Sequence, residues 1–200
     1  MRILVLNAGS SSLKASLIAD QAETLGRTSV AWGSDATREV DRRHGLRRAL
    51  GELGIGEADA ARPDAVGHRV VHGGARFAVP VRIDDAAAAD LTALVDLAPL
   101  HNPVALDTLE AARRLLPDLP HVAVFDTAFH ANLPEAWCRY PVPDSWTSEW
   151  GVRRYGFHGL SVAWSVRHAA KLLDRTPDDL RLVVAHLGSG CSVTAVDGGR

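Results

Sequence analysis

The sequence predicts an α/β protein built from two related lobes. Short β-branched apolar runs alternate with helical stretches along the 200 residues, which is typical of α/β folds. A strand, a small polar turn and a strand bearing Ser or Thr occur near residues 3–18 and again near residues 180–199. Such repetition of one unit indicates duplicated domains. The hydrophobic content of 46% is enough for a packed core.

Turn formers, acidic residues and prolines delimit the elements expected in the first part of the chain. The turn 7–10 separates two apolar runs, Asp84-Asp85 suits the positive end of a helix, and Pro103 suits a first helical turn. We expect strands at 3–6, 12–18 and within 65–74, and helices at 40–53, 86–97 and 103–116, with a loop at 56–64.

The second part begins with a buried strand at 121–127, whose polar residues Asp126 and Thr127 lie at its carboxyl end. Ligands of α/β sheets usually bind at that end. We expect an irregular segment at 137–154, a helix at 161–173 and strands at 180–188 and 191–199. We therefore divide the chain into a lobe at 1–150 and the start of a second lobe at 151–200. A hairpin with one helix is marginal by itself, so unpaired strand edges are expected there.

Charge and composition exclude several classes of protein. Twenty-two basic and 24 acidic residues give a net charge of -2 without a basic run, so neither nucleic acid nor a membrane is an expected partner. No apolar stretch approaches the roughly 20 residues of a membrane span, and no leader pattern is present, which predicts a cytoplasmic location. Cys138 and Cys191 match no disulfide or metal motif and are expected to be buried.

The opening turn, in "NAGSSSLK", has the composition of an anion-binding loop. It has neither the spacing of a P-loop nor that of a dinucleotide-binding loop. Gly9 nevertheless allows close backbone approach, while Ser10, Ser12 and Lys14 supply hydroxyls and a charge. A solvated hairpin with ordinary turn chemistry is the alternative, and spacing alone favours it.

Several histidines leave two interpretations open. In "GHRVVHGG", His68 and His72 share a strand face and Arg69 points the other way, with a guanidinium suited to carboxylate or phosphate. A zinc site at the two histidines lacks a helix and an acidic base, so structural histidines are favoured. His101, before Asn102 and Pro103, is typical of a helix cap.

His158 directly precedes the helix expected from residue 161. At that position it either donates to a developing anion beside the positive helix end or caps the turn. The chain has no G-x-S-x-G elbow, which argues against a serine hydrolase.

Taken in order, the blocks "NAGSSSLK", "GHRVVHGG", "APLHNP", "VFDTAFH", "RRYGFHG" and "AHLGSGCS" resemble the acetate kinase family. That family belongs to the superfamily of acetate and sugar kinases, heat-shock ATPases and actin. The resemblance spans the chain but corresponds to about the first half of a family member. It implies an actin-like, ribonuclease-H-like ATPase fold with a complete or nearly complete first lobe and the start of a second.

The resemblance implies reversible, ATP-dependent phosphorylation of acetate to acetyl phosphate, with ADP as the other product and Mg²⁺ or Mn²⁺ as cofactor. Such enzymes serve acetate metabolism and acetyl-CoA synthesis, and the full-length proteins are homodimers. Propionate or butyrate kinase of the same family is an alternative. A non-catalytic fragment that binds acetate or acetyl phosphate is another.

Site residues follow from the matching blocks. The resemblance implies that the catalytic residues are Arg69, Asp126 and His158, and that the metal is bound by Asn7 and Asp126. It implies that the acid is bound by Arg69, Val71, Phe157 and His101. It implies that the nucleotide phosphates are bound by Ser10, Ser12, Lys14, His186, Gly188, Ser189 and Gly190. The chain departs from the family pattern at Ser189, where Asn is usual, and at Leu160-Ser161-Val162, where Thr-Ser-His is usual.

Family members carry a second active-site arginine, a metal-binding glutamate and the adenosine pocket in a portion with no counterpart here. Loss of an arginine that neutralises a transferring phosphoryl group costs roughly 10³ to 10⁵ in rate. We therefore expect a truncated enzyme whose 200 residues are nearly inactive alone.

Overall fold

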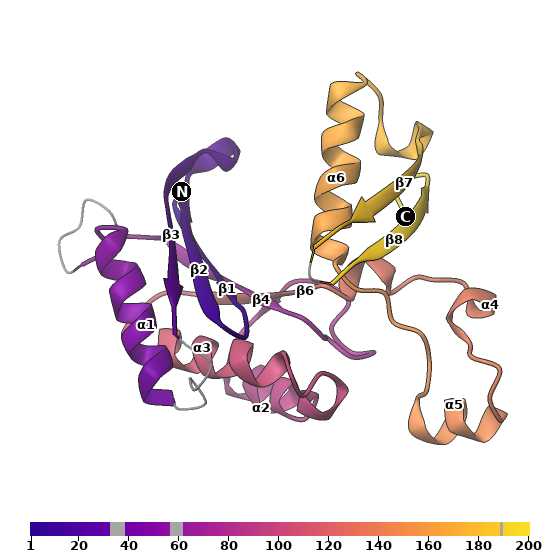
Figure 1. Cartoon of the computed structure of the whole chain (residues 1–200), viewed down its shortest axis with the longest axis horizontal. Helices are drawn as coiled ribbons and strands as arrows, with labels where there is room; N and C mark the ends of the chain where they lie inside the picture. Colours follow the sequence, from indigo (N-terminus) through magenta and orange to yellow (C-terminus); the bar gives the residue numbers. More distant parts are fainter. Residues whose placement is uncertain (33–38, 57–61, 189) are drawn as a thin grey trace. The chain divides into compact units, whose positions relative to one another are not determined.

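The computed structural model describes residues 1–32, 39–56, 62–188 and 190–200 (Figure 1). The chain separates into two compact units. Unit 1 comprises Met1–His72 and Val79–Val124, and unit 2 comprises Gly73–Ala78 and Phe125–Arg200. The boundary expected between residues 150 and 151 stays a prediction, because units of packing and lobes of a complete enzyme need not coincide.

A sheet with strand order β3-β2-β1-β4-β6-β5 organises unit 1. Its strands are β1 (Ile3–Ala8), β2 (Ser12–Ile18), β3 (Thr24–Ala31), β4 (Ala65–Val70), β5 (Val81–Arg82) and β6 (His121–Phe125). β1 pairs antiparallel with β2 through a short turn and parallel with β4. The expected opening hairpin is thus confirmed, and β1 lies between the strand that carries Lys14 and the strand that carries Arg69.

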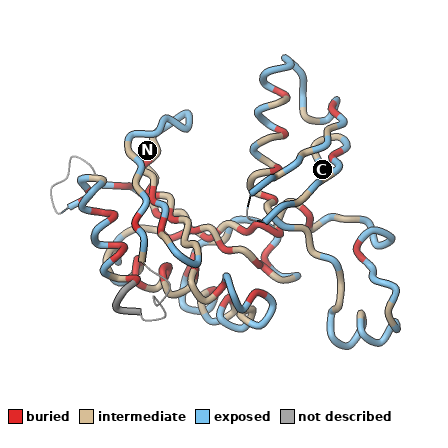
Figure 2. Tube along the Cα trace, in the orientation of Figure 1, coloured by how far each residue is buried: buried red, intermediate tan, exposed pale blue. Residues whose placement is uncertain are grey.

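One face of β1 and β2 is buried against helices α1 (Glu39–Glu52) and α3 (Asn102–Leu115). Buried residues recur along these strands and helices (Figure 2). Alternate strand residues point into this core because side chains of a strand alternate between faces. The fully covered residues are apolar: Leu4, Leu6, Leu13, Ala15 and Val66 from the strands, and Leu46, Ala49, Ala111 and Ala112 from the helices. Each large one contributes about 1.5–3 kcal/mol by burial.

The remaining helix of unit 1, α2 (Asp85–Thr92), begins at the predicted acidic pair. The Asp84 carboxylate accepts a 2.8 Å hydrogen bond from the amide of Ala87 and caps the helix. The helix ends at Thr92, earlier than the expected residue 97, and a single turn of 3-10 helix follows at Val95–Leu97. A further 3-10 turn lies at Asp20–Ala22.

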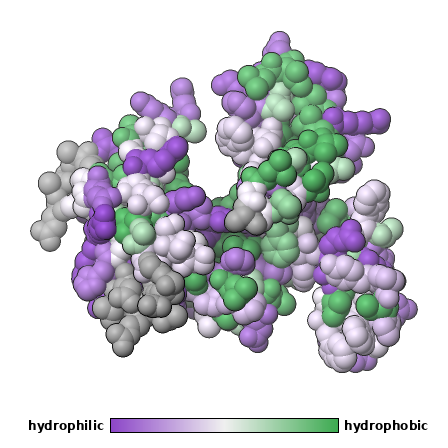
Figure 3. All heavy atoms as spheres, in the orientation of Figure 1, coloured by the Kyte–Doolittle hydropathy of each residue, from purple (hydrophilic) through white to green (hydrophobic). Residues whose placement is uncertain are grey.

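In unit 2, helix α6 (Gly159–Leu172) packs on the hairpin of β7 (Arg181–His186) and β8 (Ser192–Asp197). Val162, Val166 and Val196 form the centre of this small core. The opposite face of the hairpin is apolar but exposed: Val183 is 74% exposed and Val193 is 70% exposed. Hydrophobic side chains gather visibly over α6 and this hairpin in Figure 3.

Some expectations for elements are wrong. The segment 137–154 is not irregular throughout, because it contains the end of α4 (Glu135–Cys138) and all of α5 (Asp144–Trp150). Strands β3 and β5 were not predicted. Cys138 is buried as expected, but Cys191 is exposed beside the second polar turn.

Short 3-10 turns also lie at Ala128–His130 and Pro177–Asp179. Among the described residues, no helix combines the length and the apolar character that a membrane span needs.

Candidate active site

The turn between β1 and β2 is tightly closed. The amide of Gly9 donates to the carbonyl of Ser12 over 2.8 Å, next to the paired residues Ala8 and Leu13. Ser10 is exposed and Ser12 is half-buried. Within the described part of the chain, the amides of Ser10 and Ser11 donate to no protein acceptor. The turn therefore presents free backbone donors and a hydroxyl to solvent, as an anion-binding loop requires.

Lys14, Asn7 and Arg69 form a row across β2, β1 and β4. Asn7 lies directly opposite Lys14 in the antiparallel register. On the other side, Leu6 pairs with His68, and Nη1 of Arg69 donates to Oδ1 of Asn7 over 3.0 Å. Lys14 is exposed while Leu13 and Leu6 are buried, so the row lies on the face opposite the core. Two cationic groups flank one amide there, which makes the face suited to anions.

The chain beyond β4 is held by Asn102, a residue that sequence reasoning treated only as a capping partner. Asn102 is fully buried, and its side chain accepts from the amide of His72 over 3.1 Å and donates to the carbonyl of His72 over 3.0 Å. This two-way bond fixes the backbone next to the half-buried Val71. His101 occupies the N-cap position of α3, as expected, but its side chain is exposed and makes no capping hydrogen bond.

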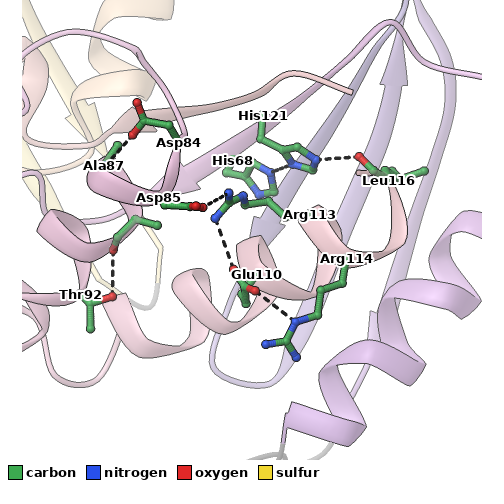
Figure 4. A network of polar contacts seen from close by, with 11 residues as sticks. His68, Asp84, Asp85, Ala87, Thr92, Glu110, Arg113, Arg114, Leu116 and His121 are labelled. Atoms are coloured by element: carbon green, nitrogen blue, oxygen red, sulfur yellow. Dashed lines mark hydrogen bonds and ion pairs between the residues drawn. The ribbon is translucent and has the colours of Figure 1, made fainter. Parts of the chain in front are cut away.

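His68 forms a buried pair with His121 of β6 (Figure 4). Nε2 of His68 lies 2.9 Å from Nδ1 of His121, and Nε2 of His121 lies 3.1 Å from the carbonyl of Leu116. Because a carbonyl only accepts, His121 carries its proton on Nε2, and His68 donates to Nδ1. Burial, and then the neighbouring His121 ring, lower the pKa of His68 to about 3.

This pairing supports the structural interpretation of His68. His72 is buried as well, and burial lowers its pKa below the usual range. The part of the chain that the structure describes contains no cluster of three or more His, Cys, Asp or Glu side chains able to hold a metal. The hydrogen bond between His68 and His121 is what the structural interpretation of His68 expects.

In unit 2, Asp126 follows β6 and lies against the start of α6. Asp126 is only 2% exposed, and its backbone carbonyl accepts a 2.8 Å hydrogen bond from the amide of Gly159. A Cβ at Gly159 would lie 2.3 Å from that carbonyl oxygen and 2.8 Å from Cβ of Phe129. Only glycine lets the helix begin this close to Asp126.

His158 and His186 are stacked, with ring centroids 4.1 Å apart. A serine hydroxyl holds each ring: Ser192 lies 3.0 Å from Nδ1 of His158, and Ser161 lies 3.0 Å from Nδ1 of His186. His158 adopts the left-handed conformation, with φ of 56° and ψ of 21°, directly before α6. Its side chain makes no capping bond to α6, so the ring does not act as a side-chain cap of that helix.

The second polar turn reaches the same histidines. A Cβ at Gly190 would lie 3.9 Å from Cε1 of His158, and Gly188 and Gly190 are both exposed. Ser189 lies outside the described residues. The structure therefore brings His158, His186 and Gly190 together within unit 2.

His130 supports the backbone that precedes His158. It is 8% exposed, and its Nε2 donates to the carbonyl of Phe157 over 3.1 Å. Burial lowers the pKa of His130, so the ring is neutral near pH 7. A Cβ at Gly156 would lie 2.1 Å from the imidazole, so this ring occupies the space that glycine leaves. Phe157 itself is 38% exposed, as a side chain that borders a ligand can be.

Sequence reasoning missed several supporting residues. Ser192 and Asn102 stood inside the quoted motifs, but no spacing rule assigns a hydrogen-bond partner so distant in sequence. Thr127 accepts from the amide of Gly73 over 3.1 Å. A Cβ at Gly73 would lie 2.5 Å from the carbonyl oxygen of Phe77, which explains why this residue is a glycine.

Comparison with known proteins identifies the family. The model of the acetokinase family matches residues 31–200. The chain belongs to the acetokinase family. The acetate kinase of Deinococcus deserti is 46% identical over 222 aligned residues, which cover 100% of this chain and 54% of that protein. The acetate kinase of Streptomyces griseus is 43% identical over 223 residues, with the same shares.

Solved structures of the acetokinase family share the fold. A Porphyromonas gingivalis acetate kinase superposes with a TM-score of 0.84 at 33% identity, covering 100% of this chain and 55% of that chain. A propionate kinase from Francisella tularensis gives a TM-score of 0.84 at 34% identity and the same coverage. The predicted α/β, actin-like ATPase fold is thus confirmed. The chain spans about half the length of the relatives that it matches.

Proposed function

We propose that this chain is the acid- and phosphate-binding part of an acetate kinase, which transfers the γ-phosphoryl group of ATP to acetate and runs reversibly. The observation that carries this proposal is the row of Lys14, Asn7 and Arg69 beside the polar turn of a chain that belongs to the acetokinase family. We propose a cytoplasmic homodimer for the complete enzyme.

Phosphoryl transfer requires positioning and charge neutralisation rather than covalent work by the protein. In unit 1, the free backbone amides of the turn and the hydroxyls of Ser10 and Ser12 bind phosphate oxygens, and Lys14 adds a positive charge. Arg69 holds the acetate carboxylate or the transferring phosphoryl group through its planar fork. The hydrogen bond to Asn7 limits the orientations of that guanidinium. Val71 borders the methyl group, and His101 is a supporting residue.

In unit 2, His158 donates to the equatorial oxygens of the phosphoryl group in the transition state. Support comes from the serine at its Nδ1 and the stacked His186, which together fix the plane of the ring. His186, Gly188 and Gly190 bind the β- and γ-phosphates, with Ser189 between the glycines. Phe157 borders the acid.

The divalent cation of the reaction, Mg²⁺ or Mn²⁺, neutralises phosphate charge when it is bound. Mg²⁺ is usually held by one or two carboxylates together with substrate phosphates and water. Asp126 fits that description, since it is a carboxylate at the carboxyl end of β6. Asn7 is a weaker fit, because its Oδ1 already accepts from Arg69 and Lys14 lies opposite. Its amide oxygen retains one lone pair for a cation or for a bound water.

A longer acid is the second candidate substrate. The Francisella tularensis propionate kinase superposes on this chain as closely as the acetate kinase does. One methylene in an apolar pocket changes specificity by about 10- to 200-fold, so small changes in the side chains that border the acid decide between the acids.

The proposal is tested by hydroxylamine trapping of acyl phosphate from ATP and acetate. We define the extended chain as residues 1–200 followed by the remaining portion of the Deinococcus deserti acetate kinase. The extended chain is expected to form acetyl phosphate, and the 200 residues alone to form little or none. Acetate, propionate and butyrate are compared in parallel. Inactivity of the folded extended chain toward all three acids would contradict the kinase proposal.

A further inference from the structure

Trp32 donates hydrogen bonds to backbone carbonyls on both sides of Ser10, in the polar turn between β1 and β2. It follows the last residue of β3, and its backbone amide donates to the carbonyl of Ser11 over 3.1 Å. Its indole Nε1 donates to the carbonyl of Gly9 over 3.2 Å. One residue thus fixes the carbonyls on either side of Ser10.

The direction of these carbonyls decides where the turn presents its donors. In a trans peptide, the carbonyl of one residue and the N–H of the next point in opposite directions. The described residues contain no cis peptide bond. When the carbonyl of Gly9 is bound by Trp32, the N–H of Ser10 in the same peptide unit must point away from the indole. That N–H has no acceptor among the described residues, so it is free to meet an anion.

The indole is itself anchored from α1. A Cβ at Gly45 would lie 3.1 Å from Cε3 of Trp32, so the helix backbone approaches the ring closely. The guanidinium of Arg42 lies 5.9 Å from the centroid of the ring. Arg42 is 5% exposed, and its Nε lies 3.2 Å from the carboxylate of Asp107 on α3. Packing of α1 and α3 thus limits the movement of Trp32.

We propose that Trp32 is a positioning residue for phosphate binding, which holds the turn so that the amide of Ser10 faces the bound phosphate. The inference rests on the proposed function, because it assumes that the turn binds phosphate. Its physical basis is preorganisation: a turn already held in its binding conformation loses less conformational freedom when the anion binds. No motif in the sequence indicates this role, because Trp32 is separated from Gly9 by two strands.

The test compares Trp32→Phe with Trp164→Phe in the 200-residue protein. Phenylalanine keeps an aromatic ring for Gly45 and Arg42 but removes the indole N–H. Trp164 is 58% exposed on α6 and lies in the other unit, which makes the same substitution there a matched control. Backbone amide resonances are followed by NMR during titration with inorganic pyrophosphate, together with hydrogen exchange of the amides of residues 9–12.

For Trp32→Phe we expect pyrophosphate affinity to fall by about three- to tenfold, as for loss of one hydrogen bond. The amide resonance of Ser10 should shift, and the amide of Gly9, which donates to the carbonyl of Ser12, should exchange faster. Trp164→Phe should behave like the wild type. Unchanged affinity and exchange in folded Trp32→Phe, with only a change in melting temperature, would overturn the positioning role alone. A wild-type protein whose turn resonances ignore pyrophosphate would overturn both this role and the phosphate role of the turn in the proposed function.

Discussion

Nη1 of Arg69 donates a 3.0 Å hydrogen bond to Oδ1 of Asn7, across two neighbouring parallel strands. The bond joins the first and second polar motifs of the sequence, which are 62 residues apart. It places the guanidinium on the sheet face opposite the core, at a position that the strand register determines. The orientation of this cation is therefore a property of the β1–β4 pairing.

Replacing Arg69 by Lys tests that orientation. Lysine keeps the charge but loses the planar fork, so we expect the turnover of the extended chain to fall by roughly 10²- to 10³-fold. Asn7→Ala removes one positioning hydrogen bond and should cost about tenfold. Initial rates of acetyl phosphate formation measure both effects. Wild-type turnover in Arg69→Lys would show that neither the fork nor its orientation matters.

The His68–His121 pair predicts acid sensitivity of unit 1. Burial and the neighbouring His121 ring lower the pKa of His68 from 6.5 to about 3. Between these two pH values, His68 is therefore neutral in the folded chain and protonated in the unfolded chain. This contribution to stability is present above pH 6.5 and falls by about 1.4 kcal/mol per pH unit as the pH decreases toward 3.

His68→Gln should reduce this pH dependence. Glutamine does not titrate, and its amide N–H can still donate to Nδ1 of His121. Urea unfolding at pH 7, 6 and 5 should therefore show a flatter decline of the unfolding free energy than in the wild type. The His121 ring also titrates, beside Arg113 and Glu110, so some pH dependence remains. Equal slopes in both proteins would refute the assignment of the acid response to His68.

Gly159→Ala should destabilise unit 2. The added Cβ meets the carbonyl oxygen of Asp126 at 2.3 Å, so the start of α6 must move and its hydrogen bond to that carbonyl must lengthen. We expect a loss of about 2 to 3 kcal/mol in unfolding free energy. Gly51→Ala is the control, because nothing lies within 4 Å of its Cβ and the residue is in a helix. That variant should be unchanged or up to about 1 kcal/mol more stable.

The exposed apolar face of the β7–β8 hairpin predicts self-association of the chain. Val193→Lys places a charge on that face, where Val193 is 70% exposed, and should lower the mass measured by light scattering at high protein concentration. Val184→Lys is the contrasting variant, since Val184 packs against the core with α6 and should be destabilised. An unchanged association with Val193→Lys would indicate that this face is not involved.

The opening hairpin could be predicted from sequence because its signal is local. Turn formers at 7–10 separate two runs whose alternate residues are buried, and the register follows from that alternation. In contrast, the more covered positions of β3 are Gly26, Thr28 and Val30, and only Val30 is apolar, so its sequence lacks the apolar alternation that marks a strand. β5 comprises only Val81 and Arg82, which is too short for any periodic pattern.

The site residues could be named from motifs, but their supporting contacts could not. The bonds from Ser192 to His158 and from Asn102 to His72 join residues 34 and 30 positions apart. Such contacts depend on how whole elements pack, which no local pattern records. A local pattern likewise suggested a capping role for His101, whose side chain makes no capping bond. The structure shows instead that the side chain of its neighbour Asn102 donates to the carbonyl of His72, just after β4.

Asp126→Asn in the extended chain is the most direct test of the kinase account. Asparagine preserves the size of the buried side chain but removes the charge proposed to orient the divalent cation. In one hydroxylamine assay with ATP and acetate, the account predicts clear acetyl phosphate formation by the wild-type extended chain and a loss of at least about 100-fold in the variant. Near-normal turnover by a folded Asp126→Asn variant would contradict the account.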